Sequence, residues 1–223
     1  MTAALILPAF GRGERMGQDK LWVDVHGRPL LALTLERGAQ AAIFDQVVIA
    51  APVHRWDALR ELTDAAGFAV IDVVAGGARR QDSVGAALER CSDVEYVCVH
   101  DAARPLASPQ LFREVLRAAQ EYGAATAGIA IVDTIKRVAD GHIVETLQRD
   151  ELIATQTPQA FSTYLLVHAH AAAREDGVVA DDDAYLVERL GQRVAVVPGE
   201  VRNIKVTHAV DLVLLRALVE ESA

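Results

Sequence analysis

The segment from Leu5 to Lys20 reads LILPAFGRGERMGQDK and combines a short apolar run with three glycines and three cations. The glycines are Gly11, Gly13 and Gly17, and the cations are Arg12, Arg15 and Lys20. Glycine lets backbone N–H groups approach an anion closely because it has no Cβ atom. Nucleotidyl transfer needs positive charge where the transition state gathers negative charge. The segment therefore predicts a polyphosphate site in which Arg15 and Lys20 reach separate phosphates.

The spacing of these glycines argues against two common nucleotide-binding loops. A dinucleotide-binding loop needs G-x-G-x-x-G and an acidic residue at the end of the second strand to hold a ribose. Here the spacing is G-x-G-x-x-x-G, and the second predicted strand ends in Ala50-Ala51-Pro52. No G-K-[ST] follows the loop, which excludes a P-loop. An oxidoreductase with a dinucleotide fold is therefore disfavoured.

Two later loops carry residues of the same kind. Gly76-Gly77-Ala78-Arg79-Arg80 follows the third predicted strand, with Ser83 near the start of a helix. A helix N-terminus with a hydroxyl is an anion or nucleobase site, and the alternative is that Asp82 or Ser83 is an ordinary helix cap. Asp101 and Arg104 follow the fourth predicted strand. There, a carboxylate can bind a metal on the nucleotide or accept from sugar hydroxyls, and the alternative is an ion pair that shapes the turn.

Two segments near the C-terminus add further charged residues. Lys205 precedes the final predicted helix, for which Thr207 is the expected N-cap. Asp181-Asp182-Asp183 opens another predicted helix, where acidic residues in the first turn are the ordinary response to the helix dipole. Lys205 stands one residue beyond the apolar Ile204, so its side chain could point inward.

Strand-like and helix-like segments alternate along the chain and must position these loops. We expect strands over 3–8, 46–51, 69–74, 96–100, 124–132 and 193–197. We expect helices over 30–42, 54–66, 82–90, 108–122, 163–174, 182–190 and 207–220. Continuous apolar strands between helices indicate an α/β fold with a mostly parallel sheet covered on both faces. The loops that follow such strands meet beyond their carboxyl ends, where ligands bind.

The regular alternation breaks at Asp133. Residues 134–148 read as two strands around Asp140-Gly141, and Asp-Gly between such runs is a strong hairpin signal. We expect a single domain over residues 1–223, with an arm at about 133–149 that leaves it. A simple surface hairpin and a contact with another subunit are the two interpretations of this arm.

Composition excludes several other classes of protein. The chain has 223 residues and a formal net charge of -9 at pH 7, which argues against a nucleic-acid-binding protein. No apolar stretch is long enough to span a membrane, and the N-terminus enters a strand at once, so we expect no targeting segment. Cys91 and Cys98 lack metal-binding spacing and are expected to be buried, reduced thiols of a cytoplasmic protein.

Taken together, these segments resemble the 2-C-methyl-D-erythritol 4-phosphate cytidylyltransferase family. The segments that carry the resemblance are PAFGRGERMG (8–17), Lys20, GGARRQDSV (76–84), HDAARP (100–105), DTIKR (133–137), TPQAF (157–161), DDDA (181–184) and NIKVT (203–207). The resemblance runs through nearly the whole chain and implies a Rossmann-like, three-layer nucleotidyltransferase fold. It also implies an enzyme that forms 4-diphosphocytidyl-2-C-methyl-D-erythritol and pyrophosphate from CTP and the sugar phosphate, in the non-mevalonate isoprenoid pathway.

The resemblance assigns roles to individual residues. It implies that Arg15, Lys20, Arg149 and Lys205 are catalytic and that Pro8, Ala9, Gly11, Gly13, Gly76, Gly77, Ser83 and Ala102 bind CTP. It implies that Asp101, Arg104, Thr134, Arg149 and Lys205 bind the sugar phosphate. Mg²⁺ accompanies CTP and is held mainly by its phosphates, with Asp101 as the candidate protein ligand. Thr134 and Arg149 would act on the site of the other subunit, which implies a homodimer formed through the arm.

The chain departs from the family pattern at the opening motif. Phe10 stands where the family has a small residue, Asp19 replaces the customary proline before Lys20, and the stretch from Met16 to Lys20 is shorter. Ala78 stands where an acidic residue is common. Two alternatives remain open. A ribitol-5-phosphate cytidylyltransferase shares the CTP loops, and Phe10 with the shortened loop leaves a catalytically impaired nucleotide-binding relative possible. Pyrophosphate release with each sugar phosphate in turn would distinguish them.

Overall fold

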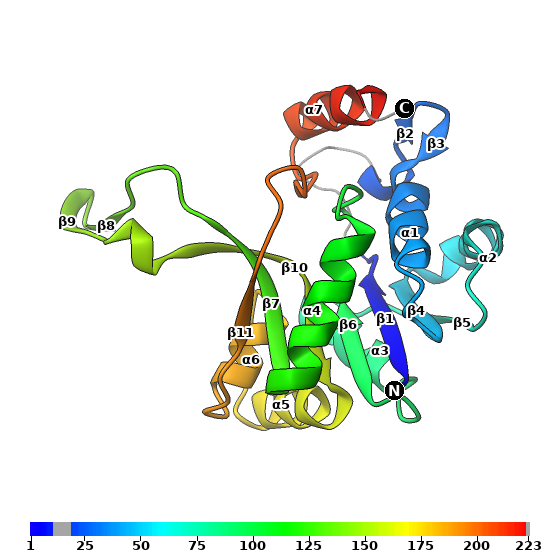
Figure 1. Cartoon of the computed structure of the whole chain (residues 1–223), viewed down its shortest axis with the longest axis horizontal. Coiled ribbons are helices and arrows are strands. Elements are labelled where there is room, and N and C mark those ends of the chain that lie inside the picture. The colour runs from blue at the N-terminus through cyan, green and yellow to red at the C-terminus, as the bar shows by residue number, and fades with distance from the viewer. Residues whose placement is uncertain (11–18, 222–223) are drawn as a thin grey trace.

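The computed structural model describes residues 1–10 and 19–221 and shows an α/β fold built on a seven-stranded sheet (Figure 1). In spatial order its strands are β11 (Ala195–Pro198), β7 (Ala124–Ala130), β10 (Ile153–Ser162), β6 (Tyr96–Val99), β1 (Ala3–Pro8), β4 (Gln46–Ala51) and β5 (Ile71–Ala75). Neighbouring strands are parallel except that β10 is antiparallel to both β6 and β7. The predicted mostly parallel sheet is therefore confirmed.

Helices cover both faces of this sheet. The α-helices are α1 (Leu30–Gln40), α2 (Trp56–Ala66), α3 (Arg80–Leu88), α4 (Pro109–Tyr122), α5 (Thr163–Glu175), α6 (Asp183–Glu188) and α7 (Ala209–Glu220). Short 3₁₀ turns form η2 (Lys20–Trp22), η3 (Val53–Arg55) and η4 (Arg149–Glu151), and β2 (Asp24–Val25) pairs with β3 (Arg28–Pro29). Within residues 1–10 and 19–221, none of the helices is long and apolar enough to cross a membrane.

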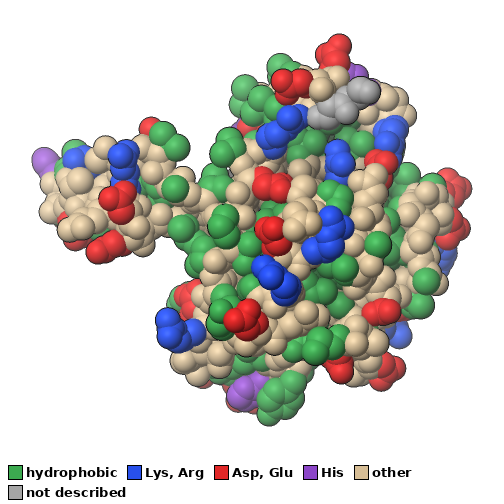
Figure 2. Space-filling model, in the orientation of Figure 1, with side chains coloured by type: hydrophobic (Ala, Val, Ile, Leu, Met, Phe, Trp, Pro, Cys, Tyr) green, Lys and Arg blue, Asp and Glu red, His purple; other side chains and the backbone are tan. Residues whose placement is uncertain are grey.

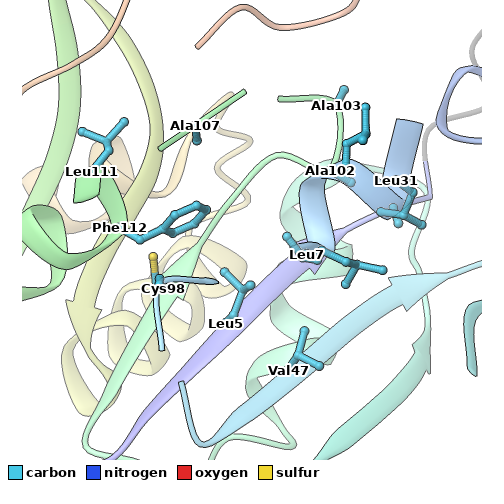
Figure 3. Close-up of a cluster of buried hydrophobic side chains, with 14 of the residues drawn as sticks. Leu5, Leu7, Leu31, Val47, Cys98, Ala102, Ala103, Ala107, Leu111 and Phe112 are labelled. Carbon is cyan, nitrogen blue, oxygen red and sulfur yellow. The ribbon is translucent and has the colours of Figure 1, made fainter. Parts of the chain in front are cut away.

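Strand β1 shows why the core strands are apolar without interruption. Leu5 and Leu7 belong to the core that packs against α1, α2 and α4, whereas Ala4 and Ile6 belong to the core beneath α3, α5 and α6. Figure 3 shows the first of these clusters, in which β1 lies beneath Phe112 of α4. The same cluster includes Ala102, Ala103 and Ala107 of the loop that follows β6, so the core anchors this loop at the carboxyl edge of the sheet.

Strand β10 is absent from the sequence expectations. Its segment IATQTPQAFS has neither a continuous apolar run nor clean alternation, and Pro158 argues against a central strand. In the structure, the Thr157–Pro158 peptide bond is cis, and the pairing with β7 is irregular between Thr155 and Gln159. The buried polar side chains of this strand bond to their neighbours, including Gln159 to Thr126. The sequence pattern did not predict this strand because several of its buried side chains are polar.

Three predicted helix starts are wrong by a few residues. Helix α3 begins at Arg80 instead of residue 82, and the segment expected as a helix from residue 54 begins with the 3₁₀ turn η3. Helix α7 begins at Ala209 with His208 as its N-cap, so Thr207 is not the cap. The Asp211 carboxylate accepts from the backbone N–H groups of both Thr207 and His208 at 2.7 Å, which moves the start of the helix.

The predicted hairpin arm is confirmed. Strands β8 (Lys136–Ala139) and β9 (His142–Thr146) pair with each other and not with the main sheet. Asp140 and Gly141 both have positive φ, as a tight two-residue hairpin turn requires. The arm projects from the body of the molecule as a separate lobe (Figures 1 and 2). All residues of β8 and β9 are exposed in the single chain.

Candidate active site

Loops at the carboxyl edge of the sheet enclose a pocket with a volume of about 470 Å³. The pocket lies between the segments that follow β1, β5 and β6 and the segment that precedes α7. The predicted site residues that line it are Pro8, Lys20, Gly77, Ser83, Asp101, Ala102 and Lys205. A pocket of this size can hold a small ligand. The structure therefore brings together residues that the sequence places far apart.

Ala9 and Gly76 do not line this pocket. Ala9 lines a smaller neighbouring pocket, and Phe10 lines both. A Cβ atom added at Gly76 would lie 2.5 Å from the Phe10 side chain, so only glycine leaves room for this ring. The glycine thus accommodates the large residue that departs from the family pattern. Phe10 is a lining residue that sequence reasoning treated only as an obstacle.

Ser83 closes the loop that follows β5. Its hydroxyl accepts from the backbone N–H of Gly77 at 3.1 Å and donates to the carbonyl of Arg79 at 3.2 Å. A Cβ atom at Gly77 would lie 2.3 Å from Asp82, so the tight turn requires glycine there as well. Arg79 is the N-cap of α3, which makes both predicted alternatives for the cap wrong. A role for this loop in nucleobase recognition stays a prediction.

The Asp101 carboxylate is surrounded by cations. One oxygen accepts from Arg80 Nε at 3.0 Å, and the other lies 2.7 Å from Lys205 Nζ and 3.7 Å from Arg104 Nε. Burial disfavours ionisation of this carboxyl, but the charges of Arg80 and Lys205 outweigh burial and hold its pKa below the usual range. The predicted ion pair with Arg104 is present, and it is the longest of the three contacts.

Arg80 links the Asp101 cluster to the buried Asp183. Arg80 was not among the site residues predicted from the sequence. Its Nη1 donates to Asp183 Oδ2 at 2.7 Å, while its Nε holds Asp101. Asp183 is only 1% exposed and also contacts His170 Nε2 at 2.9 Å. Burial opposes ionisation of Asp183, yet the Arg80 charge and the His170 hydrogen bond lower its pKa. Asp183 is thus part of a buried ion-pair chain and does more than complement a helix dipole.

His100 supports the loop that carries Asp101. Its Nε2 lies 3.0 Å from the Arg104 carbonyl, and its Nδ1 lies 3.1 Å from the Thr157 hydroxyl. The Thr157 oxygen accepts from the backbone N–H of Asp101 at 2.9 Å. Burial lowers the pKa of His100 to about 4, so its ring is neutral at pH 7. The network then assigns the proton to Nε2, which donates to the Arg104 carbonyl, while Nδ1 accepts from Thr157.

We expect the free energy of unfolding to fall as the pH decreases from about 6.5 to about 4. An unfolded histidine has a pKa of about 6.5, whereas burial lowers the pKa of His100 to about 4. Between these values the unfolded chain binds a proton that the folded chain does not, so stability is lost as the pH falls. His100 should contribute up to about 3 kcal/mol to this loss, because a tenfold change in proton affinity corresponds to about 1.4 kcal/mol.

Urea unfolding at several pH values measures this effect. His100→Gln should show a smaller loss of stability across the window than the parent protein. His168→Gln is the matched control, because it makes the same substitution at an exposed histidine. Equal pH dependence in the parent protein and in His100→Gln would contradict the assignment.

Lys20 contacts the segment that precedes α7, and this segment also carries Lys205. Lys20 Nζ donates to the carbonyl of Val206 at 3.0 Å, and the backbone N–H of Val206 donates to the Ala103 carbonyl at 2.9 Å. Arg104 Nη1 donates to the carbonyl of Asn203 at 2.7 Å, which ties the same segment to the loop after β6. Cations from three separate segments thus surround one end of the pocket, which suits it to a polyanion.

The other predicted site residues fall outside this pocket or outside the described structure. Thr134 and Arg149 lie exposed at the base of the arm and do not line the pocket of their own chain. Arg149 Nη1 donates to the carbonyl of Val132 at 3.0 Å. Gly11, Gly13 and Arg15 lie outside the described residues. Their predicted roles stay predictions.

The donor set around Asp101 does not fit a resident Mg²⁺ ion. Both carboxylate oxygens already face cations, and Mg²⁺ requires oxygen ligands in near-octahedral geometry. Among residues 1–10 and 19–221, no group of three or more His, Cys, Asp or Glu side chains has the arrangement of a metal site. Asp101 instead orders the surrounding cations.

An α/β fold with a cation-lined pocket at the carboxyl edge of its sheet is typical of proteins that bind nucleotides. The sequence model of 2-C-methyl-D-erythritol 4-phosphate cytidylyltransferase matches residues 3–221. The chain belongs to this family of nucleotidyltransferases.

Individual relatives agree with this assignment. The enzyme of that name from Bacillus mycoides is 41% identical over 213 residues, which cover 94% of each chain. The enzyme of that name from Thermus thermophilus is 36% identical in sequence. Its crystal structure matches this one with a TM-score of 0.80 and covers 99% of this chain and 100% of the other. The structure of 4-diphosphocytidyl-2C-methyl-D-erythritol synthase from Anaerococcus prevotii is 26% identical, with a TM-score of 0.89 and coverage of 98% of each chain.

Proposed function

We propose that this chain transfers the cytidylyl group of CTP to 2-C-methyl-D-erythritol 4-phosphate, in isoprenoid biosynthesis. The products are 4-diphosphocytidyl-2-C-methyl-D-erythritol and pyrophosphate. The observation that carries the proposal is the convergence of Lys20, Lys205 and the glycine loop of Gly77 on one pocket, in a chain of this family. Ribitol 5-phosphate is not favoured as the acceptor, because the relatives are named for the methylerythritol substrate.

The chemistry requires charge stabilisation more than proton transfer. A phosphate oxygen of the sugar phosphate is already anionic at neutral pH, so the reaction needs no general base. That oxygen attacks the α-phosphorus of CTP in line, a new P–O bond forms, and the bond to the β-phosphate oxygen breaks. Pyrophosphate leaves with the electron pair and its negative charge. The residues of the chain serve to orient the two anions and to stabilise the charge that develops at phosphorus.

The two lysines take different parts in this step. Lys20 approaches the pocket from the end of the opening loop and supplies positive charge to the α-phosphate. Lys205 donates one of its three N–H groups to Asp101, which fixes the ammonium at the pocket wall. Its other donors can then align the attacking phosphate. Arg104, which also contacts Asp101, fixes the neighbouring backbone through Asn203 and contributes positive charge behind the pocket wall.

The uncharged part of the pocket lining suits the nucleoside. Pro8 is the last residue of β1, Ala102 lies in the loop that follows β6, and both line the pocket with uncharged side chains. Gly77 and Ser83 form the tight loop at the N-terminus of α3. We assign this part of the lining to cytidine and the cationic end to the triphosphate. Mg²⁺ enters as part of the MgCTP substrate complex, where it neutralises phosphate charge.

We also propose a cytoplasmic homodimer that forms through the arm. Large hydrophobic residues are exposed on the arm and at its base in the single chain, namely Val132, Val138, Ile143, Val144 and Ile153. Exposed apolar groups of this kind favour burial against a partner. Thr134 and Arg149 would then reach the pocket of the partner subunit. The buried, unpaired thiols of Cys91 and Cys98 support a reducing compartment.

Mixing two inactive variants tests whether Arg149 acts on the other subunit. Lys20→Ala and Arg149→Ala should each be nearly inactive alone. After exchange of subunits, activity should recover to about a quarter of that of the parent protein, since about half of the dimers are mixed and each has one complete site. A mixture that stays as inactive as its components, with exchange verified by tagged subunits, would contradict action across the interface.

Pyrophosphate release tests the proposed reaction and its acceptor. With MgCTP present, 2-C-methyl-D-erythritol 4-phosphate should support turnover at a kcat/KM at least about a hundred times that for ribitol 5-phosphate, because unpaired polar groups penalise the wrong sugar. Preferred turnover with ribitol 5-phosphate would favour the alternative. Release with neither sugar phosphate would overturn the proposal.

A further inference from the structure

Lys20 is held at the start of a very short structural element. The 3₁₀ turn η2 spans only Lys20–Trp22, and it is preceded by Asp19 in an extended conformation. The backbone N–H of Trp22 donates to the Asp19 carbonyl at 3.0 Å, and the Leu21 side chain is buried in the core. A single turn of this kind has little stability of its own. Its neighbours must therefore fix the direction of Lys20.

Arg55 contacts the residues on both sides of Lys20. Its Nη2 lies 3.0 Å from Asp19 Oδ2, and its guanidinium carbon lies 4.8 Å from the centre of the Trp22 ring. Arg55 ends the turn η3, and its own backbone N–H donates to the Pro52 carbonyl at 2.9 Å. The Arg55 and Asp19 side chains are about two-thirds buried, so solvent screens their attraction only in part. One planar cation thus spans the turn that carries Lys20.

We propose that Asp19, Arg55 and Trp22 form a clasp that positions Lys20 for cytidylyl transfer, an inference that rests on the function proposed above. None of the three clasp residues lines the pocket that holds Asp101 and Lys205. All three line the smaller neighbouring pocket, so the clasp acts through Lys20. Without it, the backbone of residues 19–22 has more freedom, and the long Lys20 side chain spends less time in the productive geometry. A displacement of about 1 Å in a catalytic group can cost about a hundredfold in rate. The clasp makes Arg55 a positioning residue.

Arg55→Ala should lower kcat about tenfold while the KM values for both substrates change less than about twofold, because the turn loses its contacts with Arg55 but Lys20 itself remains. In a Lys20→Ala background, Arg55→Ala should cause no further loss, since the group that it positions is absent. Arg60→Ala is the matched control, because this exposed arginine on α2 pairs only with Asp57 among the ion pairs of the described residues. Equal losses from Arg55→Ala in the two backgrounds would overturn the proposal.

A second comparison tests whether the clasp acts through the backbone. Asp19 has φ of −70°, which a proline can adopt, so Asp19→Pro removes the carboxylate but keeps this dihedral fixed. Asp19→Pro should therefore retain more of the parent kcat than Asp19→Ala. Equal losses in these two variants would contradict a backbone role.

Amide hydrogen exchange provides a measurement that does not depend on turnover. The N–H groups of Trp22 and Val23 close the η2 turn, and they should exchange at least about tenfold faster in Arg55→Ala than in the parent protein. Unchanged exchange would overturn the clasp. If the parent protein released no pyrophosphate, the proposed function would fail, but the exchange rates would still decide whether the clasp orders this turn.

Discussion

Lys20→Ala should lower kcat by about a hundredfold to a thousandfold, the usual cost of removing one group that stabilises transition-state charge. The Lys20 ammonium lies at the cationic end of the pocket, within 3.0 Å of the Val206 carbonyl. In the transition state, negative charge gathers on the oxygens of the attacked phosphorus, and removal of Lys20 leaves part of that charge uncompensated. The KM for the sugar phosphate should change little, because Lys205 and Arg104 remain. Steady-state pyrophosphate release measures both parameters.

Two further measurements make the Lys20 result interpretable. Lys20→Arg keeps the charge but changes the geometry of the donors, so its kcat should lie between those of Lys20→Ala and the parent protein. The melting temperature of Lys20→Ala should match that of the parent protein, because the side chain is only partly buried. Near-normal turnover in Lys20→Ala would remove this residue from the catalytic role.

Arg80→Ala should destabilise the fold by about 3 to 5 kcal/mol, the range typical when one partner of a buried ion pair is removed. Arg80 Nη1 lies 2.7 Å from the Asp183 carboxylate, which is only 1% exposed. Without this cation, Asp183 keeps its contact with His170 but loses the arginine that neutralises it. Asp101 also loses one of its cations, so turnover should fall together with stability. Urea unfolding at neutral pH measures the loss of stability.

The adjacent arginine is a matched control for Arg80. Arg79 pairs with Asp82 on the surface and is 52% exposed, whereas the Arg80 side chain is 21% exposed. Arg79→Ala removes the same charge from the same loop and should cost much less stability. A second variant, Asp183→Asn, removes the buried charge but keeps the shape, and it should also destabilise because Arg80 then lacks one carboxylate. Equal stabilities of the two arginine variants would contradict the buried chain.

The sequence predicts the sheet because the physics of its strands is local. Val47, Val48 and Ile49 of β4 are all fully buried, and a continuous apolar run is what a strand covered on both faces requires. The rule that ligands lie beyond the carboxyl ends of parallel strands then places Gly77, Ser83 and Asp101 together. The arm is equally local, because Asp140-Gly141 specifies a turn without help from the rest of the chain.

The missed features depend on partners that are distant in the sequence. Strand β10 looks polar, and only the structure shows that Gln159 is buried between Thr126 and Asp182. Arg79 and Arg80 are indistinguishable by type, yet one faces solvent and the other faces Asp183. The sequence holds a weak indication of the Arg80–Asp183 pair, because an acidic triplet and a pair of arginines in one α/β domain can form a buried ion pair. Periodicity cannot reveal which arginine turns inward.

The path of radiolabel from CTP tests the central claim most directly. When the parent protein is incubated with α-³²P-labelled MgCTP and 2-C-methyl-D-erythritol 4-phosphate, the label should appear in 4-diphosphocytidyl-2-C-methyl-D-erythritol, with one unlabelled pyrophosphate released per product. This outcome requires that the sugar phosphate oxygen, and not water, attacks the α-phosphorus in the pocket between Lys20 and Lys205. Label that stays in CTP, or that appears only in CMP, would contradict the account.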